Sequence, residues 1–194
     1  MSQIEKPTII DKIVIWFSKF WLNHFKPWWS HLRWHKHLED ESCAIPKVTR
    51  RTMESALKDI YAHYKWKADG FSELTDSYRP IPYIYNMYVQ AAESSTIFED
   101  DCDGFHSVVY HLFQQNGYDC ALITLVTKPF TKSHTMCAFR IKDAYYVVNY
   151  QRISGPYMSL QDFVDAYNDS VRYWNLQKYD YSIRKFYTVT DESF

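Results

Sequence analysis

The chain has 194 residues, a formal net charge of −1 and a hydrophobic content of 46%. This length fits one domain with a proper core, and the near-neutral charge argues against a general nucleic-acid binder, which needs a basic surplus to displace counterions from phosphates. The chain has 4 glycines and neither a GxGxxG nor a GxxxxGK[ST] pattern. The sequence therefore excludes dinucleotide and P-loop chemistry.

The cysteines are Cys43, Cys102, Cys120 and Cys137, and none belongs to a CxxC pair. This spacing argues against a zinc ribbon or a thioredoxin-type site, and a chain of this size does not need disulfides. We therefore expect reduced thiols, with Cys120 and Cys137 in the core, and neither a metal nor a cofactor. The N-terminus lacks the pattern of a signal peptide, so the sequence favours a cytoplasmic location.

Residues 8 to 26 are predicted to form a helix that begins with a capping box of Thr8 and Asp11 and is stopped by Pro27. Its polar residues fall on one stripe and its apolar residues cover most of the remainder; these are Lys12, Lys19, Asn23 and Lys26, and Ile9, Ile13, Trp16, Phe17, Phe20 and Trp21. The apolar face either packs on the domain or on a second copy, which is the favoured interpretation, or lies at a membrane surface through residues 8–29.

Residues 28 to 45 are expected to be irregular. His31 and His35 have a spacing that can chelate a metal, but no acidic or cysteine partner stands at a defined distance from them. We interpret them as surface histidines. The predicted organisation is an N-terminal helical extension over residues 1–45, packed on the core, and one domain over residues 46–194.

The remaining elements predict an α+β fold. A helix is expected from Pro46 to near Trp66, followed by a loop-rich segment over 71–98 with a short helix at 85–94. Asp101 is a good N-cap for a helix that runs from Cys102 to about Gln115. Strands are predicted at 118–126, 134–141 and 145–150, and a short helix at 159–167.

Three polar residues in this second half can form a nucleophilic site. Cys102 lies in the first turn of a helix, where the partial positive charge favours a thiolate, and His134 and Asn149 lie on consecutive strands. If Ile141 and Ala144 close a two-residue turn, Asn149 becomes the diagonal neighbour of His134 on one face of the sheet. A four-residue turn also keeps them on one face, whereas a three-residue loop separates them.

Three points compete with this interpretation. The acidic flank Glu99-Asp100-Asp101-Asp103 would raise the pKa of the thiol unless its carboxylates point into solvent or accept backbone hydrogen bonds. His106, one helical turn after Cys102, is an alternative base that ranks second to His134. A cysteine at the start of a helix is also more often a buried small hydrophobic residue than a nucleophile.

The segment Asp101-Cys102-Asp103-Gly104-Phe105 resembles the start of the nucleophile helix in the transglutaminase-like superfamily, notably the bacterial transglutaminase-like cysteine peptidases. Those proteins carry a Gly-Asp-Cys-Glu-Asp-Phe-Ala type of motif. The likeness continues through Asn116-Gly117-Tyr118, the strand at 121–126, the segment 133–139 and the strand at 145–150. It covers about residues 55–152 and is strongest from 100 to 150.

The resemblance implies a papain-like core in which Cys102 is the nucleophile, His134 the general base and acid, and Asn149 the orienting residue. The backbone N–H of Cys102 would bind the oxyanion. The implied activity is acyl transfer through a Cys102 thioester on a peptide or protein substrate, with hydrolysis of a peptide or amide bond favoured over cross-linking.

The sequence also departs from the family pattern. Gly104 stands where an acidic residue is common, and His106 stands where Ala is usual. The second oxyanion donor stays open among Trp66, Tyr83, Tyr85 and Asn86. The alternative function is a non-catalytic binding or scaffold module, which an elevated Cys102 pKa would favour and a pKa well below about 8.5 would contradict.

Overall fold

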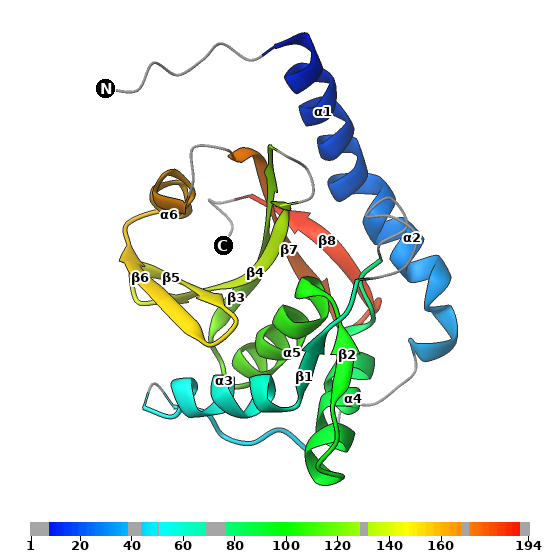
Figure 1. Ribbon diagram of the computed structural model, residues 1–194, viewed down its shortest axis with the longest axis vertical. Helices are drawn as coiled ribbons and strands as arrows, with labels where there is room; N and C mark the ends of the chain where they lie inside the picture. Colours follow the sequence, from blue (N-terminus) through cyan, green and yellow to red (C-terminus); the bar gives the residue numbers. More distant parts are fainter. Residues whose placement is uncertain are drawn as a thin grey trace.

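A computed structural model describes residues 8–38, 44–49, 51–68, 77–128, 132–167 and 171–190. Its centre is helix α5 (Cys102–Gln115), which packs against an antiparallel sheet of order β6-β5-β4-β3-β7-β8 (Figure 1). The strands are β3 (Asp119–Thr127), β4 (His134–Ile141), β5 (Ala144–Asn149), β6 (Arg152–Tyr157), β7 (Val171–Asp180) and β8 (Lys185–Val189). The α+β class predicted from the sequence is confirmed.

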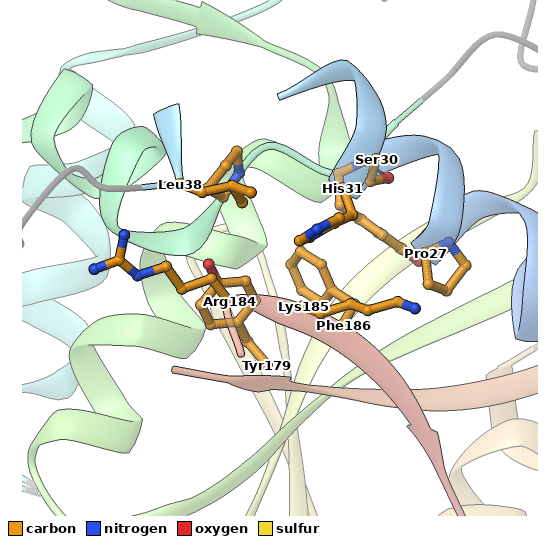
Figure 2. Close-up of a pocket in the computed structure, with 10 residues that line it drawn as sticks. Pro27, Ser30, His31, Leu38, Tyr179, Arg184, Lys185 and Phe186 are labelled. Atoms are coloured by element: carbon orange, nitrogen blue, oxygen red, sulfur yellow. Dashed lines mark hydrogen bonds between the residues drawn. The ribbon is translucent and has the colours of Figure 1, made fainter. Parts of the chain in front are cut away.

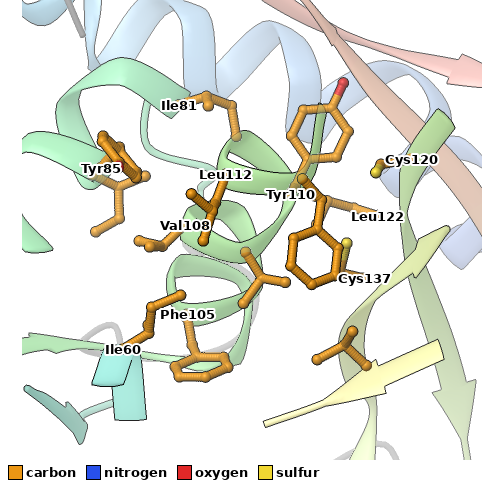
Figure 3. Close-up of a cluster of buried hydrophobic side chains, with 14 of the residues drawn as sticks. Ile60, Ile81, Tyr85, Phe105, Val108, Tyr110, Leu112, Cys120, Leu122 and Cys137 are labelled. Carbon is orange, nitrogen blue, oxygen red and sulfur yellow. The ribbon is translucent and has the colours of Figure 1, made fainter. Parts of the chain in front are cut away.

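Alternate residues of the sheet belong to two different cores. On β3, Leu122 belongs to the core that contains α5, whereas Ala121 and Ile123 belong to the core beneath α6 (Leu160–Tyr167). Figure 3 shows the first core, where Cys120 and Cys137 lie beside the apolar face of α5. Both thiols are free and buried, as predicted.

Helix α5 is enclosed by the fold. The sheet covers one side, and α3 (Met53–Ala62) and α4 (Ile81–Glu93) pack against it as well. Short strands β1 (Tyr64–Trp66) and β2 (Phe98–Asp100) form a parallel pair, and β2 leads directly into the start of α5. The predicted bounds of α5 and its Asp101 cap are confirmed, because the Asp101 side chain accepts a hydrogen bond from the Asp103 amide.

Two predictions for the middle of the chain are wrong. Helix α3 begins at Met53 rather than Pro46, and the residues before Trp66 form strand β1 instead of the end of a helix. Helix α4 begins at Ile81, well before residue 85, because Pro82 lies in its first turn, where a missing N–H breaks no intrahelical bond. The predicted turn at Gly70 lies outside the described residues.

The N-terminal segment is helical for longer than predicted. Helix α1 (Ile9–Phe20) has the expected capping box of Thr8 and Asp11, and a π-helical turn (Trp21–Phe25) then leads into α2 (Lys26–Arg33) and a 3₁₀ turn (His35–His37). Pro27 does not stop the helix but stands in the first turn of α2. The π turn, in which the Lys26 amide bonds to the Trp21 carbonyl, directly precedes this proline.

None of the helices in the described part of the chain combines the length and the apolar character that a membrane span requires.

Candidate active site

Cys102 is the first residue of α5 and is half-buried. The backbone N–H of Thr135, on β4, donates a hydrogen bond of 3.4 Å to the Cys102 sulfur. This contact joins the start of the helix to the strand that carries His134. The sulfur therefore lies beside the residue that follows the predicted base, although Cys102 and His134 are 32 positions apart in the chain.

The ring of His134 is oriented by Asn149. The hairpin of β4 and β5 has the two-residue turn considered above, with Ile141 paired to Ala144, and His134 Nε2 lies 3.0 Å from Asn149 Oδ1. Because a carbonyl oxygen only accepts, Nε2 carries the proton and Nδ1 is the basic nitrogen. Among the described residues, no hydrogen bond joins His134 to the Cys102 sulfur, whose bond comes from Thr135.

The alternative base, His106, is occupied on both ring nitrogens. The Tyr150 amide donates to its Nε2 at 3.0 Å, so the proton is on Nδ1, which lies 2.7 Å from the Cys102 carbonyl oxygen. Burial lowers the pKa of His106 well below its ordinary value. The ring thus ties the first turn of α5 to the end of β5, and it has no free nitrogen with which to accept the thiol proton.

The acidic flank is neutralised within the protein rather than turned into solvent. Asp103 pairs with Lys26 of α2 at 2.8 Å, and the two side chains are 3% and 4% exposed. Asp100 pairs with Arg79 at 2.8 Å, while the Asp101 side chain caps the helix. The expected backbone hydrogen bonds are found for Asp101, which caps the helix, and for Asp100, whose Oδ1 accepts from the Asp101 amide at 2.9 Å. The ion pairs of Asp100 and Asp103 were not expected, because their cations come from segments distant in the chain.

Gly104 allows the Asp100 carboxylate to pack against the first turn of α5. A Cβ at this position would lie 2.2 Å from Asp100 Cγ, well inside van der Waals contact. Any side chain at position 104 would have to displace the buried Asp100 carboxylate, which already occupies that space.

The resting site is uncharged at its centre. Burial, followed by the charges of Asp101 and Asp103, raises the pKa of the Cys102 thiol well above its ordinary value, and the Thr135 amide and Lys26 oppose this rise. Burial also lowers the pKa of His134, against the effect of its Asn149 hydrogen bond. Both shifts favour the uncharged forms, so that at neutral pH Cys102 is a thiol and His134 a neutral imidazole.

A buried polar chain connects α2 to the strand beside the sulfur. The Lys26 ammonium lies 3.9 Å from the centroid of the Tyr78 ring, and the Tyr78 hydroxyl lies 3.3 Å from Thr124 Oγ1. Thr124 Oγ1 is in turn 3.0 Å from Thr135 Oγ1. The N-terminal segment thus supports both the acidic neighbour of Cys102 and, through this chain, the strand that donates to its sulfur.

The four candidates for a second oxyanion donor are placed differently. The Tyr83 ring packs against Trp34 and Tyr85 is buried against His111, so both rings are engaged elsewhere. Trp66 pairs with Asp100 across β1 and β2 and is exposed, and Asn86 is half-buried on α4.

Tyr64, which the sequence reasoning missed, donates from its hydroxyl to the Asp101 carbonyl at 2.9 Å. Lys26, Arg79 and Thr135 were missed as well. Nothing in their local sequence marks them, since each acts through a contact distant in the chain.

Metal binding finds little support in the described residues. His35 Nδ1 lies 3.0 Å from the Leu32 carbonyl oxygen, while His31 lines a separate small pocket between α2 and β8 (Figure 2). The three carboxylates that come within 4.8 Å of one another are Asp100, Asp101 and Asp103. Their ion pairs and helix cap already account for this cluster.

Comparison of the chain with protein-family models, with curated proteins and with solved structures finds no match.

Proposed function

We propose that the chain is a thiol-dependent acyl-transfer enzyme with a transglutaminase-like core, which hydrolyses a peptide or amide bond through Cys102, His134 and Asn149. One observation carries the proposal: a helix-start thiol accepts a hydrogen bond from Thr135, and the adjacent His134 is held by Asn149 at 3.0 Å. A nucleophile, a base and a group that orients the base are the three parts that such chemistry needs.

The neutral resting pair defines the order of the steps. The Cys102 thiol transfers its proton to His134 Nδ1 as the sulfur attacks the substrate carbonyl, and the resulting imidazolium gives that proton to the leaving amine. The acyl group remains on the sulfur as a thioester. Water then attacks the thioester, gives one proton to His134 and releases the acid, and the proton returns to the thiolate.

The start of α5 supplies charge stabilisation during attack. The first amides of a helix have no partner within the helix and carry partial positive charge. The Cys102 N–H stands at this position, which suits the oxyanion that forms next to its own sulfur. Lys26 keeps Asp103 paired, so that this carboxylate opposes the developing negative charge less strongly.

A small activated ester tests the acyl-transfer step without a known substrate. With p-nitrophenyl acetate, the wild type is expected to release a stoichiometric burst of p-nitrophenolate and to carry an acetyl group on the Cys102 peptide. Hydroxylamine should remove that group, and Cys102→Ala should show neither signal while retaining its fold. If p-nitrophenyl acetate acetylates Cys102 no faster than it acetylates free cysteine, Cys102 is not an activated nucleophile and the proposal fails.

A second function, a non-catalytic binding module built on the same core, is favoured by the raised pKa of Cys102. The pH dependence of Cys102 alkylation by iodoacetamide separates the two functions. For an enzyme with the proposed mechanism, the alkylation rate plotted against pH should show a step that reflects the titration of His134. His134→Ala should lose this step. A binding module should show a single thiol titration at high pH in both proteins.

A further inference from the structure

Helix α1 turns its polar side toward the protein and its apolar side toward solvent, which is the reverse of the usual arrangement in a surface helix. The buried residues of α1 are Asp11 and Ser18, and the same inward stripe continues through Leu22 and Lys26. The opposite side is apolar and exposed, and we call it the outward face of α1. It consists of Ile9 (76% exposed), Ile10 (70%), Ile13 (61%), Trp16 (68%), Phe17 (37%) and Phe20 (48%).

Polar contacts fix this orientation. Asp11 accepts hydrogen bonds from Thr8 and pairs with Lys128 at 2.9 Å, and the exposed Lys19 lies 5.7 Å from the Tyr173 ring centroid on β7. In the following π turn, Asn23 accepts hydrogen bonds from side chains of β7. A rotation that buried the outward face would break these contacts. The prediction that the apolar face packs on the domain is therefore wrong for α1.

The chemistry of the outward face matches that of a membrane interface. Trp16 stacks on Phe20 with 6.3 Å between ring centroids, and aromatic rings of this kind gather at the headgroup level of bilayers. The face continues past the π turn to the exposed Trp28. A contiguous exposed apolar surface of this kind marks an interaction site.

The charges around the outward face select its partner. Lys12 and Lys19 are exposed beside it, whereas Asp11, which is the acidic residue of α1, faces inward and is neutralised by Lys128. A second copy docked by this face would bring like-charged edges together without a carboxylate of α1 to pair them. Anionic headgroups complement the same edge, and each nearby lysine strengthens such binding.

We propose that the outward face of α1 inserts into the interface of a membrane that contains anionic lipid, and so attaches the protein to that surface. A helix of 12 residues is about 18 Å long, which is shorter than the roughly 30 Å of a hydrocarbon core. The helix would therefore lie in the plane of the membrane with its polar side on the protein. This attachment is independent of the acyl-transfer proposal and would serve a catalyst or a binding module equally.

Co-sedimentation of the full chain with vesicles tests the proposal. One set of vesicles consists of phosphatidylcholine alone and the other contains phosphatidylglycerol as well. The wild type should bind the anionic vesicles more tightly, and Lys12→Gln should weaken this binding about fivefold. The triple variant Ile13→Ser, Trp16→Ser, Phe20→Ser should lose at least tenfold in affinity for both.

A matched triple variant at exposed apolar sites elsewhere, Ile97→Ser, Met158→Ser and Ile183→Ser, should bind as the wild type does. Circular dichroism verifies that each variant is folded. The proposal is overturned if the wild type binds neither vesicle, or if both triple variants lose affinity equally. It is also overturned if light scattering finds a dimer that only the α1 triple variant abolishes, because a second copy would then cover the face.

Discussion

The ammonium of Lys26 lies 2.8 Å from the carboxylate of Asp103, and both groups are almost fully buried. One residue belongs to the N-terminal segment and the other directly follows the candidate nucleophile. The pair therefore joins the stability of the N-terminal segment to the electrostatics of the thiol, and it leads to the first prediction.

Lys26→Met should lower stability and thiol reactivity together. The variant removes the cation that pairs with a buried carboxylate, which costs about 3–5 kcal/mol, and this cation also opposes the raised pKa of Cys102. Urea unfolding and the pH dependence of Cys102 alkylation measure the two effects. The double variant Lys26→Met, Asp103→Asn should recover much of the lost stability and much of the lost Cys102 reactivity. If the double variant behaves as the sum of the two single variants, the pair has no coupling.

Removing the base or its orienting group should slow acylation to different degrees. His134→Ala should lower the acylation rate with p-nitrophenyl acetate by about 10²–10⁴-fold, which is the usual contribution of a general base. Asn149→Ala should cause a smaller loss, while Asn149→Asp should preserve most of the rate because a carboxylate also accepts from Nε2. His35→Ala, at an exposed site, is the control. Equal losses in Asn149→Asp and Asn149→Ala would contradict an orienting role.

Stability should decrease as the pH falls below about 6.5. Burial lowers the pKa of His111 to about 4, so between these values the unfolded chain binds a proton that the folded chain excludes. For His111 alone the unfolding free energy should decrease by about 3 kcal/mol across this range. His111→Gln should reduce the slope by about 1.4 kcal/mol per pH unit near pH 5.5, measured by urea unfolding. An unchanged slope would show that another group titrates.

Gly104→Ala should destabilise the protein, although Ala for Gly in a helix normally stabilises by about 1 kcal/mol. The added methyl would collide with the Asp100 side chain and displace it from Arg79. We expect a loss of about 1–3 kcal/mol, typical of overpacking, in thermal or urea unfolding. A variant as stable as the wild type would show that the Asp100 side chain has room to move.

The second half of the chain was predictable because its signals are local. The Asp101 cap and the bounds of α5 follow from adjacent residues, and strand β4 begins at His134 and ends at Ile141 as predicted. The two-residue turn then sets the register that brings Asn149 to His134, since side chains alternate between the faces of a strand. The middle of the chain was harder, because prolines that suggested loops lie in the first turns of helices.

By itself, the sequence determined the α+β class and the place of Cys102 at a helix start, since each depends on patterns within a few residues. It placed His134 and Asn149 on one face only for a two- or four-residue turn, and the structure has the two-residue turn. Only the tertiary structure decided which cations neutralise Asp100 and Asp103, that His106 is bonded on both nitrogens, and that α1 turns its apolar side outward. These features depend on contacts between segments far apart in the chain. A periodic pattern predicts that a helix has an apolar side, but the partners of its polar side decide where that side points.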